Sequence, residues 1–266
     1  MRIVSLNLRY AHSADMNTQG IREPRIADFV KAFRPDSFGV QECEKFWYDR
    51  LTATIGALGY VPAQPEAYSE KGSYAFKNFI WYDPNKSELV ESGRMWLSET
   101  PDVPSRGFGS RFYISAGYAV LKDKYTGECA AHVNTHLNVD SQDIRISEVE
   151  VLKTIISELE GKGYPVFVTG DFNSGPLSPI YAEMTKNLAD SRYVASVSTD
   201  LKTYTGYKEE NVDIPKEKYL MGDFCFQSKE GVRTDKFDVV DKWGGGYLSD
   251  HNALIIDVTL SKEVEA

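Results

Sequence analysis

Residues 165–173 have the sequence PVFVTGDFN, and this stretch points to the fold class. Its first half is a short apolar run rich in β-branched and aromatic residues, which is typical of a buried strand. The strand ends in Asp171 and Asn173, which flank Phe172. Polar side chains at the end of a buried strand cost free energy unless they are satisfied, so they usually have a purpose. The stretch therefore predicts a buried strand with functional groups at its carboxyl end.

The rest of the chain alternates between strand and helix patterns. Apolar residues recur at every second position over 2–8 and at helical spacing over 22–33 and 142–160. We predict strands over 2–8, 37–41, 73–82, 87–97, 112–121, 128–137, 165–170, 223–227, 235–241 and 252–260, and helices over 22–33, 44–58 and 142–160. Ser178-Pro179 predicts the start of another helix. Without a linker or a low-complexity stretch, the sequence predicts one α/β domain over 1–266, with two mixed sheets covered by helices.

The bulk composition narrows the function classes. The chain has 266 residues, a net charge of −9 and a sequence pI of about 5.1. An acidic surface repels nucleic acid unless a basic patch or a bound metal compensates, which argues against a tight, non-specific DNA or RNA binder but leaves a nuclease possible. The three cysteines form no zinc spacing and no even disulfide set. We therefore expect free thiols, a cytoplasmic location and no membrane span.

Further polar residues interrupt or end the other apolar segments. They are Asn7, Glu42, His136, Asp223, Asp250 and His251. Carboxylates such as Glu42, Asp171 and Asp250 suit Mg²⁺ or Mn²⁺, and the absence of cysteine from the set argues against zinc. Either Asp171 or Asp223 is suited to orienting a histidine. His251 suits a general base, and Asn7, Asn173 and His136 suit hydrogen bonds to phosphate oxygens.

Each of these residues has a bland explanation when it is taken singly. Asn7 fits a bulge or an edge, Glu42 fits the first turn of the helix that follows it, and residues 170–173 fit a simple turn. His132 and Asn134 share a strand face with His136 by the two-residue period, and we expect them to pack and hydrogen-bond within the sheet. Only the joint occurrence of the set favours a functional site.

The ordered motifs resemble the endonuclease/exonuclease/phosphatase superfamily, from Asn7 to about Leu260. The motifs are Ser5-Leu6-Asn7, Gln41-Glu42, Thr135-His136-Leu137, Gly170-Asp171-Phe172-Asn173, Asp223-Phe224 and Ser249-Asp250-His251. Each is short, but the ordered set is specific. A closer likeness is to a bacterial branch similar to deadenylase-like members. The features shared with that branch are the run from Trp96 to Pro101, Arg111, Arg145 and the stretch 203–207.

This resemblance implies a four-layer α/β/β/α sandwich of two mixed sheets flanked by helices. It also implies a divalent metal, Mg²⁺ or Mn²⁺, with Glu42 as the main ligand. Asn7 and Asp250 would lie near that metal, and Asn7 would also contact the substrate. The position after Leu137 is Asn138, whereas an Asp often follows the Thr-His motif by two residues in the family, so we assign no metal role to position 138.

The resemblance also implies how the reaction would be divided among the other residues. Asp171 and Asn173 would handle the attacking water and the phosphate, and His136 would contact the phosphate. His251, paired with Asp223, would be the base or the stabiliser of the transition state. Whether Asp171 or the His251–Asp223 pair takes the proton is left open by the sequence, since the two can titrate as one unit.

Two arginines are predicted to bind the substrate phosphate. Arg145 follows the His136 motif at the start of a helix, where a cation is unfavourable for the helix dipole. An anionic ligand or an acidic cluster is therefore expected beside it. Arg111 is predicted near the same phosphate from its likeness to the branch pattern.

The set as a whole predicts a metal-dependent phosphoester hydrolase. The alternative is a non-catalytic protein that binds a phosphate ligand on the same fold, and the completeness of the polar set argues against it. We expect a compact phosphoester or a short chain end as substrate, because the lysines are scattered among acidic residues. Tyrosines that suit stacking on a base or sugar are Tyr193, Tyr204, Tyr207 and Tyr219. The sequence indicates no membrane association and no stable protein partner.

Overall fold

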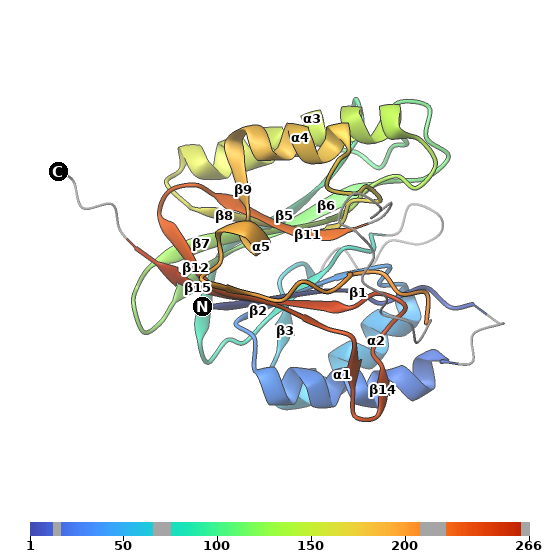
Figure 1. Cartoon of the computed structure of the whole chain (residues 1–266), viewed down its shortest axis with the longest axis vertical. Helices are drawn as coiled ribbons and strands as arrows, with labels where there is room; N and C mark the ends of the chain where they lie inside the picture. Colours follow the sequence, from blue (N-terminus) through green and yellow to red (C-terminus); the bar gives the residue numbers. More distant parts are fainter. Residues whose placement is uncertain (13–16, 66–75, 208–221, 262–266) are drawn as a thin grey trace.

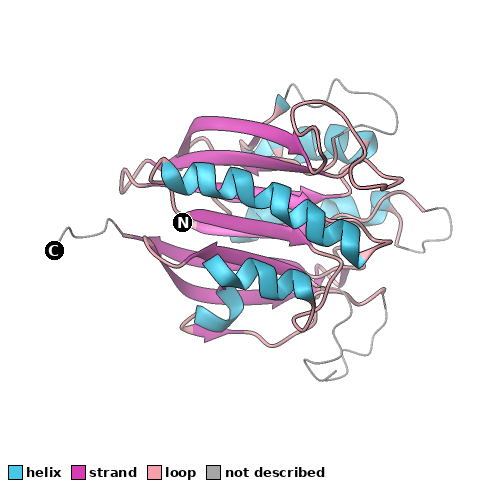
Figure 2. Cartoon of the chain, turned by 90° about the horizontal axis from the view of Figure 1, so that it is seen from above, coloured by secondary structure: helices cyan, strands magenta, loops and turns pink. Residues whose placement is uncertain are grey.

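The computed structural model describes residues 1–12, 17–65, 76–207 and 222–261 of the chain. Within these residues, a seven-stranded and a six-stranded sheet lie face to face, and helices cover the outer face of each (Figure 1). Seen from above, helices α3 (Gln142–Gly161) and α4 (Pro179–Asn187) lie over the strands beneath them and run roughly along them (Figure 2). The predicted four-layer α/β/β/α arrangement of two mixed sheets is confirmed.

The seven-stranded sheet carries the N-terminal half of the predicted site. Its strands, in order, are β10 (Val197–Ser198), β12 (Val232–Val240), β15 (Ala253–Leu260), β1 (Arg2–Asn7), β2 (Ser37–Gln41), β4 (Ile80–Tyr82) and β3 (Val61–Pro62). β1 and β2 are parallel, which requires a crossover, and α1 (Gln19–Phe33) supplies it. Together with α2 (Lys45–Thr54) and the 3₁₀ helix η1 (Gly56–Leu58), α1 covers the outer face of this sheet.

The six-stranded sheet carries the other half. Its strands, in order, are β5 (Ser87–Trp96), β6 (Ser115–Asp123), β7 (Cys129–His136), β8 (Val166–Asp171), β11 (Asp223–Ser228) and β9 (Leu188–Asp190). β7 and β8 are parallel and joined by α3, whose apolar face packs on them. The Ser178 hydroxyl caps α4 as predicted. The short helix α5 (Ser191–Val194) follows β9, and β13 (Lys242–Trp243) pairs with β14 (Gly246–Tyr247).

The interior between the two sheets contains a polar seam beside an apolar core. The His132 ring lies 2.6 Å from the Ser37 hydroxyl and 2.7 Å from the Thr169 hydroxyl, so it joins the two sheets. Burial lowers the pKa of His132 to about 3, which keeps this ring neutral. Asn134 accepts a hydrogen bond of 2.6 Å from Gln41 across the same gap. These residues therefore bond across the sandwich as well as within their own sheet, where sequence reasoning placed them.

Two predicted elements are shorter in the structure. Of the strand predicted over 73–82, residues 73–75 lie outside the described part, and the structure assigns strand only to Ile80–Tyr82. The chain before it still follows β2, because Val40 N donates to Phe79 O at 2.9 Å. Just before this strand, Asn78 donates its side-chain amide to Ser115 O of the other sheet at 2.7 Å. The helix predicted over 44–58 ends at Thr54, and a 3₁₀ turn over Gly56–Leu58 completes it.

In the described part of the chain, none of the helices combines the length and the apolar character needed to cross a membrane.

Candidate active site

The predicted site residues come from strand ends that meet at one edge of the sandwich, the edge away from the N-terminus in Figure 1. β1 ends at Asn7, and its parallel neighbour β2 ends one residue before Glu42. On the facing sheet, the register sets His136 of β7 and Asp223 of β11 on either side of Asp171 of β8. The topology thus gathers residues that are far apart in the sequence, because parallel strands end at the same edge.

Asp171 lies at the centre of this cluster and is almost fully buried. One carboxylate oxygen accepts from Asn173 N at 2.9 Å, and the other accepts from Asn7 Nδ2 at 3.1 Å. Nε2 of His136 lies 3.4 Å from that second oxygen, and Nε2 of His251 lies 3.7 Å from it. Burial raises the pKa of the Asp171 carboxyl, but the two histidines and these hydrogen bonds outweigh it and bring the pKa below its usual value. Asp171 is therefore ionised at neutral pH.

His251 and Asp223 form the predicted hydrogen-bonded pair, with Nδ1 of the ring 2.9 Å from the Asp223 carboxylate. Thr203 Oγ1 accepts from Asp223 N at 2.8 Å and fixes the start of β11. Burial lowers the pKa of His251, but Asp223 and Asp171 more than offset this and raise the pKa to about 10. Burial raises the pKa of Asp223, and His251 offsets this only in part. His251 thus holds a proton between two carboxylates, and the three groups share it as a unit.

Glu42 lies on the other side of Asp171 and is the more open of the two carboxylates. Its Oε1 accepts from Asn7 Nδ2 at 3.1 Å, its Oε2 accepts from Tyr10 N at 2.7 Å, and Nδ1 of His136 lies 4.0 Å away. Its side chain is 20% exposed, against 2% for Asp171. One amide nitrogen thus holds both carboxylates toward the same space. Hard oxygen donors of this kind, partly open to water, fit Mg²⁺ or Mn²⁺.

The side-chain amides of two asparagines in the site form hydrogen bonds to other groups of the protein. Asn173 donates to Leu137 O at 2.8 Å and lies 2.9 Å from Nε2 of His136, so it orients that ring. Asn7 directs its amide nitrogen to the two carboxylates, and its carbonyl oxygen accepts from Arg9 N at 2.9 Å. In this arrangement both asparagines position other site residues, whereas the sequence suggested direct contact with phosphate and, for Asn7, with the metal.

Asp171, Asp223 and His251 also form a cluster of potential metal ligands, since one donor atom from each lies within 4.8 Å of the others. The Nδ1 atom of His251 is taken by its hydrogen bond to Asp223. Its other ring nitrogen faces Asp171, on the opposite side of the imidazole. An ion bound at Nε2 would therefore not reach the carboxylate bonded to Nδ1. The geometry suits a proton-sharing unit better than a metal centre.

Asp250, the second predicted metal neighbour, is engaged by the chain itself. The Arg9 guanidinium forms an ion pair with its Oδ2, and the Ser249 hydroxyl donates to its Oδ1 at 3.1 Å. Sequence reasoning missed Arg9. Its position two residues after Asn7, just beyond the end of β1, was the available signal, because strand ends here carry the site.

Three site residues that are not glycine have left-handed backbones. The φ angle is 55° at Arg9, 54° at Glu42 and 47° at Asn173. Such conformations are uncommon for residues with a side chain and cost free energy, and they cluster at functional sites. Each of the three follows the end of a site strand, where the turn of the backbone aims the side chain.

Arg145 is half-buried near the site. It donates to Asn138 O at 2.8 Å from the first turn of α3. Burial lowers the pKa of its guanidinium, while the charges of Glu148 and Asp171 act in the opposite direction. The guanidinium therefore interacts electrostatically with Glu148 and Asp171, and its contact with phosphate stays a prediction.

Arg111 has a different environment. Its Nε lies 2.7 Å from the Asp140 carboxylate, its side chain is 70% exposed, and its guanidinium stacks on Phe112 at 4.7 Å. The structure pairs it with this surface carboxylate rather than with a carboxylate of the cluster around Asp171. Its contact with phosphate stays a prediction.

Glu148 is a buried acid beside the site, and it gives a pH-dependent prediction. It accepts from Asn138 N at 2.8 Å, and burial raises its pKa to about 8. The folded state thus keeps a proton that the unfolded state releases near pH 4.5, so the free energy of unfolding falls as pH rises between these values, by up to about 1.4 kcal/mol per pH unit.

Glu148→Gln should be more stable than the wild type at pH 8 and similar at pH 4.5, as measured by urea unfolding. Glu150→Gln, on the exposed face of the same helix, is the control. Equal pH slopes for wild type and Glu148→Gln would contradict the expectation.

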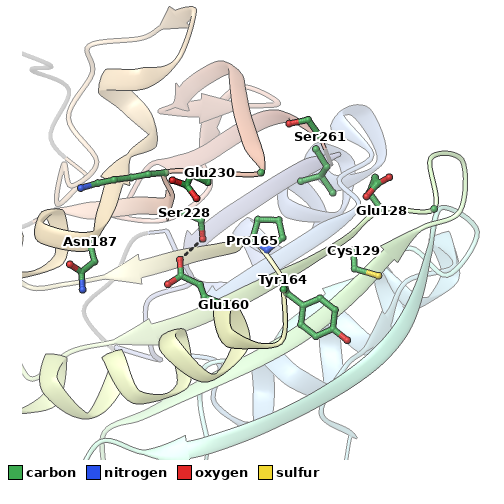
Figure 3. Close-up of a pocket in the computed structure, with 14 residues that line it drawn as sticks. Glu128, Cys129, Glu160, Tyr164, Pro165, Asn187, Ser228, Glu230 and Ser261 are labelled. Atoms are coloured by element: carbon green, nitrogen blue, oxygen red, sulfur yellow. Dashed lines mark hydrogen bonds between the residues drawn. The ribbon is translucent and has the colours of Figure 1, made fainter. Parts of the chain in front are cut away.

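A broad hollow lies at the opposite end of β8 and is separate from this cluster (Figure 3). Its lining includes Glu160, Tyr164, Pro165 and Ser228, and the Ser228 hydroxyl donates to Glu160 at 2.6 Å. Pro165 immediately precedes β8, whereas Asp171 ends it. Cys129, also in the lining, has a pKa raised by burial, which disfavours the thiolate that a nucleophile requires.

The fold and the site together define a phosphoesterase-like sandwich, and comparison with known proteins agrees. Residues 8–251 match the Endonuclease/Exonuclease/phosphatase family, so the chain belongs to this family. A structure of an endonuclease/exonuclease/phosphatase from Bacteroides vulgatus has a TM-score of 0.84 and 27% identity, covering 98% of each chain. The mannosyl-6-phosphatase of Bacteroides thetaiotaomicron has a TM-score of 0.82 and 26% identity, covering 98% of this chain and 100% of its own.

A structure of lower sequence identity agrees with the fold. The catalytic domain of human Nocturnin has a TM-score of 0.71 and 19% identity, covering 98% of this chain and 93% of its own. At this identity the likeness shows the fold alone. An uncharacterised protein of Acanthamoeba polyphaga mimivirus is 27% identical over 168 residues, which span 58% of this chain and 58% of the viral protein. The predicted superfamily is confirmed.

Proposed function

We propose that this protein is a metal-dependent phosphoester hydrolase in which a base-assisted water attacks phosphorus. The observation that carries the proposal is the position of Asp171. Its one carboxylate links the Glu42 side of the site, through Asn7, to the His251–Asp223 pair. A group that binds a cation and a group that accepts a proton thus flank one small space, as hydrolysis of a phosphoester requires.

Glu42 and Asp171 are the residues that would hold the ion, which we propose to be Mg²⁺ or Mn²⁺. When bound, it supplies Lewis-acid polarisation of a phosphoryl oxygen. The remaining tasks fall to the chain. The unit of Asp171, His251 and Asp223 takes the proton of the attacking water. His136, oriented by Asn173, and the cationic Arg145 face the charge that develops on the phosphate oxygens.

The proposed substrate is a compact phosphoester or a short chain end. The Tyr204 ring packs edge-on against His251 with centroids 4.8 Å apart, and it is 39% exposed, so it can stack on a base or sugar at the mouth of the site. Tyr219, predicted for the same role, lies outside the described residues. The relative named as a mannosyl-6-phosphatase supports a compact substrate. We further propose that residues 1–266 act as one domain in the cytoplasm, without a membrane or a stable protein partner.

A substrate panel tests the proposal. Sugar phosphates, nucleotides, short oligonucleotides and an aryl phosphodiester would be compared with duplex DNA and structured RNA, with and without Mg²⁺, across a salt series. We expect Mg²⁺-dependent hydrolysis of the compact substrates. The logarithm of the binding constant should fall only slightly with the logarithm of the salt concentration, because each DNA phosphate that a protein neutralises contributes about −0.9 to that slope. Efficient duplex cleavage with a steep slope would contradict the substrate class. Phosphate binding without turnover of any ester would favour the non-catalytic alternative.

A further inference from the structure

We infer that Arg9 is a built-in cation of this site, which occupies the carboxylate of Asp250 and so limits the site to a single divalent ion at Glu42. The inference rests on the proposed function, because it takes a divalent ion at Glu42 as given. The contacts of Arg9 bear on whether the site binds one divalent ion or two.

The first observation is that the backbone of Arg9 is fixed. Its amide donates to Asn7 Oδ1 at 2.9 Å, and its carbonyl accepts from the Trp47 indole at 2.9 Å. The backbone adopts a left-handed conformation between these two anchors. A residue with a side chain keeps such a conformation only where its surroundings determine it. The direction of the Arg9 side chain is therefore set by the end of β1.

The second observation is that each carboxylate oxygen of Asp250 already has a partner, one of them a cation. Arg9 pairs with Oδ2 and the Ser249 hydroxyl donates to Oδ1. The Asp250 side chain is 4% exposed and that of Arg9 is 22% exposed, so the pair is largely withdrawn from water. Breaking a buried ion pair leaves an uncompensated charge, which is strongly unfavourable. A second Mg²⁺ at Asp250 would have to displace Arg9 at this cost.

The third observation is that two aromatic rings hold the guanidinium in place. Its carbon lies 5.8 Å from the centroid of Tyr10 and 5.5 Å from that of Tyr207. Each ring attracts the cation through its electron-rich face. Arg9 is thus held from several sides at once, which opposes a swing away from Asp250.

The charges of the site agree with this assignment. With Asp250 neutralised by Arg9, the carboxylates on the open side of Asn7 are Glu42 and Asp171. Two carboxylates balance one divalent ion. A second ion would need further anionic ligands, and Asp250, the carboxylate that the sequence set beside the metal, is already paired. The arginine therefore supplies a permanent positive charge where a second metal would otherwise lie.

The test measures the number of divalent ions bound per chain and does not depend on turnover. The binding of Mn²⁺ to the full-length protein is titrated by electron paramagnetic resonance, which reports free Mn²⁺. We expect one ion per chain in the wild type and in Arg9→Lys, which keeps the charge. Arg9→Gln, of similar length but neutral, should bind a second ion more weakly. The double variant Arg9→Gln, Asp250→Asn should return to one. Arg2→Ala is the matched control, because Arg2 pairs with Asp257 from the opposite end of β1.

The possible outcomes distinguish a failure of this inference from a failure of the proposed function. Two ions in the wild type, or a single ion in Arg9→Gln, would overturn the role of Arg9 while leaving a metal-dependent hydrolase in place. No bound ion in the wild type would overturn both. Circular dichroism and the unfolding midpoint of each variant show whether it is folded, and Arg9→Lys and Arg9→Gln differ in charge while sharing a similar size.

Discussion

Glu42→Gln is expected to reduce turnover by at least ~10²-fold, since outer groups that only support a metal ligand already cost 10–100-fold when they are removed. Glutamine removes the negative charge that draws the ion. It also sets an amide group against Asn7 Nδ2, which now donates to Glu42 Oε1 at 3.1 Å. The measurement is kcat with a compact substrate across a Mg²⁺ titration, together with the Mn²⁺ affinity. The loss should be largest at limiting metal.

The matched control is Glu44→Gln. Glu44 lies two residues further along the chain, and its carboxylate makes an ion pair with Lys77 at 3.3 Å, with 39% of its side chain exposed. This variant should retain wild-type kcat and metal affinity. If Glu42→Gln also keeps wild-type turnover at limiting Mg²⁺, then Glu42 does not hold the ion, and the metal must be sought elsewhere in the site.

Much of the fold could be predicted because it depends on local patterns. The alternation over 2–8 and the apolar stretch before Asp171 correspond to β1 and β8, and the helical spacing over 142–160 corresponds to α3. Of the strand predicted over 73–82, the structure assigns only Ile80–Tyr82, and residues 73–75 lie outside the described part. Asn78, just before that strand, donates its side-chain amide to the other sheet. Hydrogen bonds of this kind depend on the distance between sheets, which no local pattern encodes.

The residues that form the candidate site could be predicted, whereas many of the contacts between them could not. Strand ends carrying polar residues could be recognised one by one, and register then brought His136 and Asp223 beside Asp171. The direction in which an amide points could not be derived in this way. Asn173 donates both of its hydrogens within the chain, and Asp250 faces Arg9. These preferences arise from groups that are close in space and distant in sequence.

Asp223→Asn is expected to reduce kcat by ~10²–10⁴-fold, the range for loss of a positioned acid–base group. The Asp223 carboxylate accepts from Nδ1 of His251 at 2.9 Å and raises the pKa of that ring. An asparagine has no negative charge and therefore does not raise the pKa of His251. Its amide hydrogens also favour the imidazole tautomer that has no proton on Nδ1. Besides kcat, the imidazole titration of His251 should move to lower pH by NMR, a shift that a merely structural role would not produce.

Asp190→Asn is the matched control for this last experiment. Asp190 is also a buried aspartate with a pKa raised by burial, and it lies opposite Phe226 on the strand next to β11. Its carboxylate accepts from Arg192 N and from the Tyr181 hydroxyl, so its loss perturbs the sheet without touching His251. It should lower stability and leave the His251 titration unchanged. If both variants lose activity equally and neither shifts the histidine titration, Asp223 supports the fold rather than the proton transfer.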